Sequence, residues 1–123
     1  LVSKYPNWVA VVVYKDGHAH FFDGAKDFFK FIAAPQKFDP VHQRDSVAGM
    51  WVTEFYGLTR IEARKAFYVI GSDVLGPMGH ELVPLENEAD ARDFLKEHRG
   101  KRFVSFDQVT PEIVLGLDKG KAE

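Results

Sequence analysis

The spacing of apolar residues predicts a strand hairpin and then a helix in the first third of the chain. Residues 8–14 are β-branched and aromatic, and a second apolar run at 18–22 follows the turn sequence Lys15-Asp16-Gly17. Beyond this hairpin, apolar residues recur at i, i+3, i+4 and i+7, which is the spacing of one helical face. The residues on this face are Ala25, Phe28, Phe29 and Ile32. We therefore predict a helix that ends before Pro35.

The polar residues of this first helix complete an amphipathic pattern. Asp23 precedes the apolar stripe and has the residue type of a helix N-cap. We expect the charged residues within the helix to face solvent, opposite the stripe: Lys26, Asp27 and Lys30. The pattern thus predicts a helix with a single buried face.

A second helix with the same stripe is predicted near residues 88–98. Asn87 is its expected N-cap and Gly100 its expected end. Its apolar face matches that of the first helix at a constant offset, with Ala91, Phe94, Leu95 and His98 in the four positions. A Gly-His pair begins the strand before each helix, and a related strand follows each one, so we infer an internal repeat.

The remaining β-branched and aromatic runs complete the fold prediction. Strands are expected at 47–57, 66–70, 80–86 and 101–109, with Pro84 indicating an edge strand, and Thr110-Pro111 is typical of the start of a last helix. The order strand-strand-helix-strand then occurs twice, which defines an α+β fold with antiparallel sheet. The expected organisation is a first ββαβ unit at 1–56, a connecting strand at 57–73, a second ββαβ unit at 74–117 and a flexible tail at 118–123.

Composition narrows the classes of function. The 123 residues carry a formal net charge of -2 and no dense basic run, so we expect no nucleic-acid partner. The chain contains no cysteine, which excludes disulfides, zinc fingers and thiol catalysis within it, and no apolar run has the length of a membrane span. Because the sequence starts at Leu1 without an initiator methionine, we expect a processed or trimmed form.

The loop sequence "GSDVLGPMGHE", residues 71–81, carries the main candidate chemistry. Met78 and His80 are two residues apart, so in an extended segment their side chains point to the same side. Gly76 and Gly79 shape the loop and let a ligand approach closely. A thioether and an imidazole together suit Cu(I). The alternative is that Met78 packs in the core and His80 is a solvated strand residue, and the residue types alone favour this alternative.

A second pair of histidines lies in the first predicted hairpin. His18 and His20 form a His-x-His pair on one side of a strand, which makes them a possible metal site. The alternative is an exposed strand beside a turn, and we favour this alternative for His18. By the internal repeat, His18 and His80 occupy equivalent places, so the two units could present histidines to one shared cleft. His98 lies near the C-terminus of the second predicted helix, and we expect it to have a structural role rather than to bind a metal.

Catalysis finds little support in the sequence. Ser72, Asp73 and His80 supply the residue types of a hydrolase, but no nucleophile-elbow motif and no phosphate-binding glycine loop is present. We therefore predict that the protein is not an enzyme, and a small hydrolase is the weakest of the alternatives.

The segments "VSKYPNWVAVVVYKDGHAHFFDGAKDFFKF" and "ARKAFYVIGSDVLGPMGHELVPLE" resemble the NosL family, and the likeness continues through "EADARDFL" and "RFVSFDQVTPE". These proteins are copper-binding lipoprotein accessory factors of nitrous oxide reductase assembly. The resemblance implies a non-enzymatic carrier of Cu(I), held by a lipid anchor on the periplasmic side of a bacterial membrane. It also implies nitrous oxide reductase or another copper-handling protein as partner, and two related strand-strand-helix-strand units as the fold.

The family's Met-Gly-His segment falls on Met78, Gly79 and His80 of this sequence. The family also has a Cys-x-x-Cys-Gly-Met motif just before the place where this sequence starts, and that motif is absent here. The resemblance therefore leaves open whether upstream cysteines complete the copper site. The competing interpretation is a metal-free extracytoplasmic module that binds a partner protein through its aromatic surface, including Trp8 and Trp51.

Overall fold

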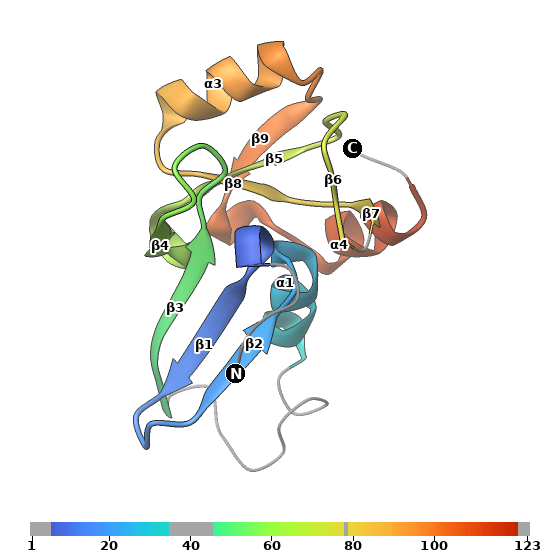
Figure 1. Cartoon of the computed structure of the whole chain (residues 1–123). Helices are drawn as coiled ribbons and strands as arrows, with labels where there is room; N and C mark the ends of the chain where they lie inside the picture. The colour runs from blue at the N-terminus through green and yellow to red at the C-terminus, as the bar shows by residue number, and fades with distance from the viewer. Residues whose placement is uncertain (1–5, 35–45, 78, 121–123) are drawn as a thin grey trace.

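The computed structural model describes residues 6–34, 46–77 and 79–120. In Figure 1 a four-stranded antiparallel sheet forms the lower half of the molecule and a three-stranded antiparallel sheet the upper half. The lower sheet has the order β2-β1-β3-β4, and α1 packs on its strands β1 and β2. The elements of this half are β1 (Ala10–Tyr14), β2 (Ala19–Phe22), α1 (Ala25–Ala33), β3 (Val47–Thr53) and β4 (Arg60–Glu62), preceded by the short 3-10 helix η1 (Pro6–Trp8).

The upper sheet has the order β8-β5-β9, and α3 packs on all three of its strands. Its elements are β5 (Phe67–Ile70), β8 (Val83–Leu85), α3 (Glu88–Glu97) and β9 (Arg102–Ser105), with the 3-10 helices η3 (Ala63–Lys65) and η4 (Phe106–Gln108) at its margins. A short hairpin, β6 (Leu75–Gly76) and β7 (Gly79–His80), leaves this sheet toward the last helix, α4 (Pro111–Asp118).

The strand order confirms an α+β fold with two related ββαβ units. In each unit the first strand lies in the middle of its sheet, the second on one side of it, and the strand after the helix on the other side. The matching sets are β1-β2-α1-β3 and β5-β8-α3-β9. Strand β5, which starts the second set, lies within the segment 57–73 that we expected to connect the units.

The predicted helical faces are the ones that build the core. Phe28 of α1 and Phe94 of α3 are fully buried, and Ala25 and Ala91 are buried beside them. Phe28 belongs to a large cluster that spans α1, both sheets and α4, whereas Phe94 belongs to a smaller cluster under α3. Burial of large aromatic side chains from both helices supplies the main stabilising contribution to such a core.

Helix α1 departs from its sequence-based prediction at its N-terminus. The N-cap residue is Gly24 rather than Asp23, and no side-chain cap bond is made there. Lys26, which we expected to face solvent, is buried. The prediction was wrong because an amphipathic pattern assumes one covered face, whereas α4 covers the first turn of α1 from a second side. The expected caps of α3 and α4, Asn87 and Thr110, are confirmed.

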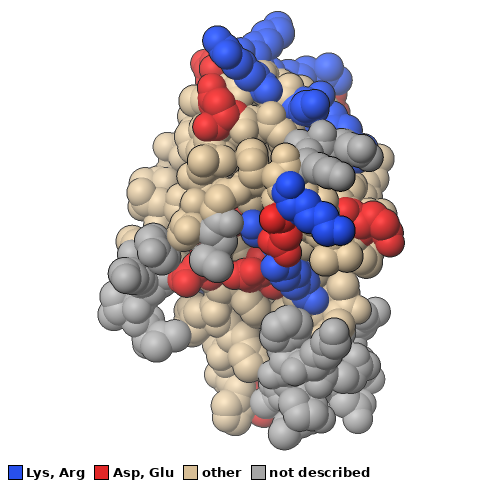
Figure 2. Space-filling model, turned by 90° about the vertical axis from the view of Figure 1, so that its right-hand side faces the viewer, with Lys and Arg blue, Asp and Glu red and all other residues tan. Residues whose placement is uncertain are grey.

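Charged residues are unevenly distributed over the surface. Figure 2 shows lysines and arginines gathered at the upper end of the molecule, where α3 ends and β9 begins. The exposed basic residues of that region are Lys96, Arg99, Lys101 and Arg102. Across the middle of the same face, acidic and basic groups alternate (Figure 2). Among the described residues, no helix has the length and apolar character needed to span a membrane.

Candidate functional site

The predicted loop at 71–81 folds into the tight hairpin β6–β7. Leu75 pairs with His80 and Gly76 pairs with Gly79 in an antiparallel register. Gly79 has a φ of 94°, in the left-handed region that a side chain disfavours, so a glycine is required at this position. Met78 lies outside the described residues. The hairpin therefore holds His80 at the end of a sharply bent segment.

The imidazole of His80 is half-buried and lies beside the end of α4. A Cβ atom placed on Gly120 would lie 3.8 Å from both Cδ2 and Nε2 of this ring. Within residues 6–34, 46–77 and 79–120, the His80 ring has no hydrogen-bond or ion-pair partner. Both ring nitrogens can therefore serve as donors or acceptors for a ligand.

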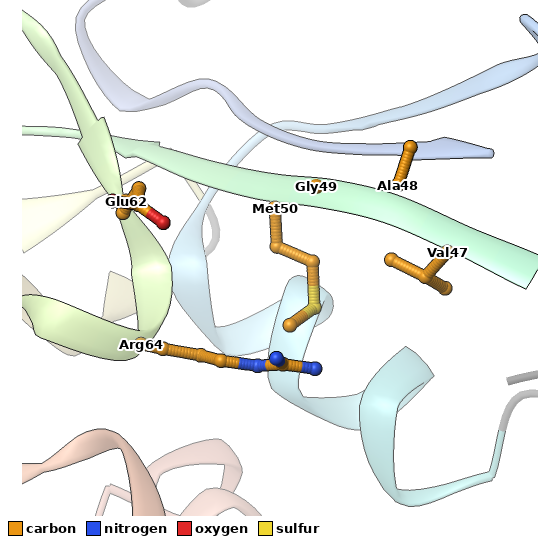
Figure 3. Close-up of a pocket in the computed structure, with 6 residues that line it drawn as sticks. All are labelled: Val47, Ala48, Gly49, Met50, Glu62 and Arg64. Carbon is orange, nitrogen blue, oxygen red and sulfur yellow. The ribbon is translucent and has the colours of Figure 1, made fainter. Parts of the chain in front are cut away.

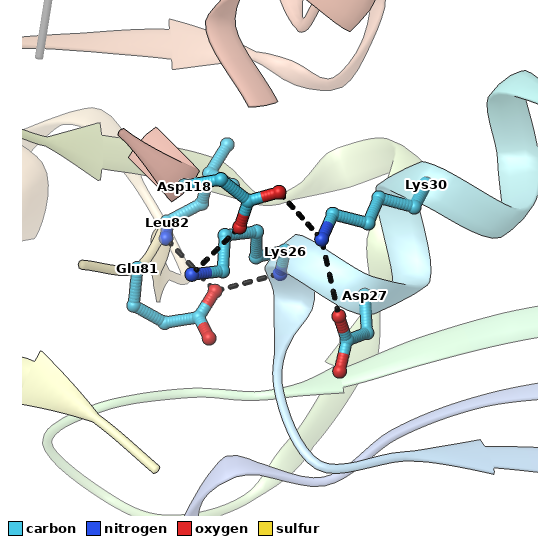
Figure 4. Close-up of polar contacts among 6 residues, drawn as sticks. All are labelled: Lys26, Asp27, Lys30, Glu81, Leu82 and Asp118. Atoms are coloured by element: carbon cyan, nitrogen blue, oxygen red, sulfur yellow. Dashed lines mark hydrogen bonds and ion pairs between the residues drawn. The ribbon is translucent and has the colours of Figure 1, made fainter. Parts of the chain in front are cut away.

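Glu81 follows His80 and points into the protein. Its side chain is buried, and Oε1 accepts hydrogen bonds from the backbone N–H of Lys26 at 2.6 Å and of Leu82 at 3.0 Å (Figure 4). Burial raises the pKa of the Glu81 carboxyl to about 7 from its ordinary 4.5, and these two N–H groups hold back part of the rise. Glu81 therefore joins the hairpin directly to the first turn of α1.

Two glycines make room for the Glu81 side chain. A Cβ atom on Gly24 would lie 2.2 Å from Oε2 of Glu81, which no real contact allows. A Cβ atom on Gly76 would lie 3.1 Å from its Cγ and 3.3 Å from its Oε2. Gly24 belongs to the N-terminus of α1 and Gly76 to β6, so the carboxylate fills the space between these two segments.

An ion-pair network continues from this point to α4. The Asp118 carboxylate binds the Lys26 ammonium at 3.2 Å and the Lys30 ammonium at 2.6 Å (Figure 4). The hydrogen bond from Lys30 lowers the pKa of Asp118 most, with Lys26 adding to the effect and burial opposing it. The network ties α1 to the end of α4, which flanks His80.

The other two candidate histidines, His18 and His20, do not lie beside His80. Nδ1 of His18 is 3.0 Å from the Asp16 carboxylate in the exposed β1–β2 turn. The ring of His20 packs among aromatic rings, 5.4 Å from Phe31 and 5.7 Å from Tyr14 between centroids. Figure 1 shows the β1–β2 turn at the lower end of the molecule and β7 beside α4 at its right. The structure thus does not bring His18 and His20 together with His80.

The hydrolase residues are also separated. The Asp73 carboxylate lies 3.1 Å from Nδ1 of His98 rather than beside His80. The Ser72 hydroxyl accepts a hydrogen bond from the backbone N–H of Val74 at 3.3 Å. Ser72 and Asp73 therefore stabilise the loop and the end of α3 locally.

Met50, the methionine outside the loop, lines a shallow pocket of about 90 Å³ on β3. The side chain of Arg64 extends beneath its thioether, and Glu62 lies at the far end of the pocket (Figure 3). Met50 is buried in the main core cluster. Its sulfur is thus a packing atom of the first sheet. Across the described residues, no group of three or more histidine, aspartate or glutamate side chains is arranged to hold a metal ion.

Neither tryptophan is fully exposed. Trp8 packs against the smaller core cluster, and the six-membered ring of Trp51 lies directly over Gly49, where a Cβ atom would come within 2.3 Å of it. Both side chains are half-buried. The aromatic surface considered for partner binding is therefore smaller than the sequence suggests.

Two related ββαβ units, the second with a short glycine-containing hairpin between its first two strands, place the protein in a class of small repeated α+β domains. Within that class, the chain belongs to the NosL family, whose model matches residues 1–114. The resemblance drawn from the sequence is confirmed.

Two solved structures are similar to this chain. The copper chaperone NosL from Shewanella denitrificans has 22% sequence identity and a TM-score of 0.69, with 85% of this chain and 79% of that chain covered. The apo-NosL protein from Achromobacter cycloclastes has 25% identity and a TM-score of 0.56, with 85% and 87% covered. No curated protein matches the sequence.

Sequence reasoning missed the buried residues behind the hairpin, Glu81 and Lys26. Their partners come from elements 55 residues apart in the chain, a separation that no periodic pattern records. The one available signal was the pair of glycines at 24 and 76, because a glycine outside a turn often marks close approach of another group.

Proposed function

We propose that this protein is a copper-binding accessory protein that carries Cu(I) toward nitrous oxide reductase or a related copper enzyme. Copper is its cargo, and Met78 and His80 are the donors we assign to it. The observation that carries the proposal is the His80 ring: it stands in a tight hairpin with no hydrogen-bond or ion-pair partner among the described residues. The other described histidines, at 18, 20 and 98, are engaged with carboxylates or aromatic rings.

The chemistry of the donors supports copper over harder cations. A thioether is a soft ligand that selects Cu(I), and a neutral imidazole also suits copper, whereas Mg²⁺ and Ca²⁺ prefer oxygen ligands. The relative from Shewanella denitrificans is described as a copper chaperone, and this chain shares its fold. A site with few protein donors also suits a carrier, since a recipient can complete the coordination and withdraw the ion. Cysteine or methionine from the family's upstream motif would supply further donors.

The family resemblance also underlies the proposed location. We place the protein on the periplasmic side of a bacterial membrane, held by a lipid on a segment upstream of Leu1. Fractionation of cells that express the natural gene tests this placement. Recovery of the protein with the cytosol would contradict it.

Copper binding is tested by titrating Cu(I) against a competing chelator under anaerobic, reducing conditions. Met78→Leu removes the sulfur and keeps the size of the side chain, and His80→Gln removes the imidazole. Each is expected to weaken Cu(I) binding by more than about tenfold, or about 1.4 kcal/mol. The stability of the metal-free protein should change little, because leucine keeps the size and apolar character of methionine and His80 is only half-buried.

His18→Gln is the matched control, since His18 is an exposed histidine at the equivalent Gly-His position of the first unit. It should bind copper like the wild type. The three variants should be measured both in this chain and in a chain extended upstream through the cysteine motif. Unchanged affinity of both Met78→Leu and His80→Gln in the longer chain would exclude these residues as ligands.

Delivery of copper to nitrous oxide reductase requires a separate test. Copper-loaded protein should restore activity to copper-free nitrous oxide reductase faster than an equal amount of copper held by a small chelator. If the two sources act at the same rate, the protein stores copper but does not deliver it to that enzyme.

A further inference from the structure

We propose that Glu81 is a positioning residue: its buried carboxylate fixes the β6–β7 hairpin against the N-terminus of α1 and thereby sets the place of His80. This inference rests on the proposed copper function. It adds a residue that does not touch the ion but determines how its donors are held.

The hairpin has little structure of its own to fix it. Each of its strands is two residues long, and two-stranded hairpins of this size are marginally stable in water. Contacts from outside the hairpin must therefore define its position. Two are described: the end of α4 on the side of His80, and Glu81 on the side of α1.

The hydrogen bond between Glu81 and α1 pairs a buried carboxylate with a backbone N–H group in the first turn of the helix. The first N–H groups of a helix have no partner within it, and Gly24 at the N-cap offers no side chain to accept from them. The Glu81 carboxylate accepts from the N–H of Lys26, in the first turn, at 2.6 Å. Negative charge is also favourable at this end of a helix. The second unit thus supplies an acceptor for this N–H group of the first unit.

The backbone segments around the Glu81 carboxylate leave its side chain little room to move. The closest approaches are to Gly24 on the helix side and Gly76 on the hairpin side, where any Cβ atom would meet the Glu81 side chain. Since Gly76 pairs with Gly79 in the hairpin, the contact reaches the backbone beside Met78 and His80.

Glu81 directly follows His80, the last residue of β7, and its buried carboxylate reaches the first turn of α1. The His80 ring lies near Gly120, just beyond the end of α4. Loss of the Glu81 hydrogen bonds would let the hairpin rotate and shift the imidazole. Outer partners of this kind typically change metal affinity by about 10–100-fold.

The test compares Glu81→Leu, Glu81→Gln and Glu54→Leu. Glu54 is a matched control: it is also buried, and its carboxylate also accepts two backbone N–H bonds, from Tyr56 and Gly57, in a loop of the first unit. Two quantities are measured for each protein. One is Cu(I) affinity by chelator competition; the other is amide hydrogen exchange of residues 75–82 without metal.

Glu81→Leu should weaken Cu(I) binding by about 10–100-fold and speed exchange in the hairpin. Glu81→Gln retains an acceptor oxygen and should stay close to the wild type in both measurements. Glu54→Leu should lose stability but keep wild-type copper affinity. If Glu81→Leu does not fold, Gly76→Ala replaces it, because its methyl group would displace the Glu81 side chain and should weaken copper binding in the same direction.

Three results would overturn the proposal. One is wild-type affinity in Glu81→Leu. Another is an equal loss in Glu54→Leu, which would indicate a general effect of stability. The third is a loss in Glu81→Gln without faster hairpin exchange, which would make the carboxylate itself a ligand. If His80→Gln binds copper like the wild type, the copper function fails instead, and hydrogen exchange alone then decides whether Glu81 holds the hairpin.

Discussion

Phe28 and Phe94 occupy equivalent positions in α1 and α3, and both rings are fully buried. Phe28 meets Phe29 edge-on at 5.1 Å, and Phe94 meets Phe55 at 4.8 Å between ring centroids. Truncation leaves a cavity that such a core refills only in part. We expect Phe28→Ala and Phe94→Ala each to cost about 3–5 kcal/mol in urea denaturation. Leu115→Ala, at an exposed position, is the control. Losses below about 1 kcal/mol would mean that the rings are not buried.

The Glu81 carboxyl predicts a pH dependence of stability. Its pKa is about 7 in the folded protein and 4.5 as an ordinary value, so folding takes up a proton between these pH values. The stabilising contribution is full below about pH 4.5 and is lost as pH rises through 7. The whole change amounts to about 3 kcal/mol.

The measurement compares metal-free wild type and Glu81→Gln by chemical denaturation at pH 5 and pH 8. Because glutamine does not titrate, the stability of the wild type relative to the variant should fall between the two pH values. A difference that stays constant would show that Glu81 titrates in the folded chain as it does in the unfolded one.

Individual residues differ in how well the sequence predicts their burial and their role. Met78 and His80 stand out in the sequence because a thioether and an imidazole between glycines have a specific chemistry, and their role as copper donors stays a prediction. Glu81 and Lys26 were not recognisable, since each has the residue type of a solvated position. Their burial depends on which distant element covers the first turn of α1. The sequence pattern describes one helix at a time and omits this information.

At the scale of elements, the ends of the helices are set in two different ways. Helix α3 carries its own cap, with Oδ1 of Asn87 accepting from the N–H of Asp90 at 2.8 Å. Helix α1 depends on Glu81 from the other unit. A local cap can be predicted from a few neighbouring residues, which is why Asn87 was predicted correctly and Asp23 was not.

The local cap of α3 gives a further prediction. Asn87→Ala removes the acceptor for the Asp90 N–H and should cost about 1 kcal/mol of stability. Asn87→Ser keeps a capping oxygen and should lose only a few tenths of that value. Thermal and urea denaturation measure both variants. Equal losses for alanine and serine would indicate that Asn87 contributes something other than the cap.

The long periodic elements were predicted, and the shortest ones were not. Strands β1, β3, β5 and β9 follow runs of β-branched and aromatic residues. The sequence predicts one strand over residues 80–86, but the structure divides it into β7 and β8 on either side of Glu81 and Leu82. Two-residue strands are too short for any alternation to be visible. At the division, the Glu81 side chain accepts one long-range hydrogen bond, from Lys26, and one local bond, from Leu82.

At the scale of the whole molecule, α4 connects the second half of the chain to the first helix. Asp118 binds both Lys26, whose side chain is buried, and Lys30, which is about one-third exposed. Asp118→Asn weakens the compensation of a buried ammonium and should cost about 2 kcal/mol, less than a fully buried pair would, because Asp118 is itself partly exposed.

The double variant Lys26→Met/Asp118→Asn tests whether the stability lost in Asp118→Asn comes from leaving the Lys26 charge without its carboxylate. Methionine fills the space of the lysine stem without a charge, so the second change should restore part of the stability lost in Asp118→Asn. Chemical denaturation of the two single variants and the double variant gives the coupling. Strictly additive losses would mean that Lys26 and Asp118 do not interact in solution.

The hydrogen bond from Lys26 of α1 to Glu81 also bears on the order in which the two units fold. The ribosome synthesises the first unit before Glu81, and 55 residues separate Glu81 from the Lys26 N–H group whose hydrogen bond it accepts. Until then the Lys26 N–H group lacks the acceptor that Glu81 provides, and Gly24 has no side chain to offer one. Contacts between such distant residues close slowly because the intervening chain must first be ordered. We therefore expect the first turn of α1 to be completed late in folding, when the hairpin docks against it.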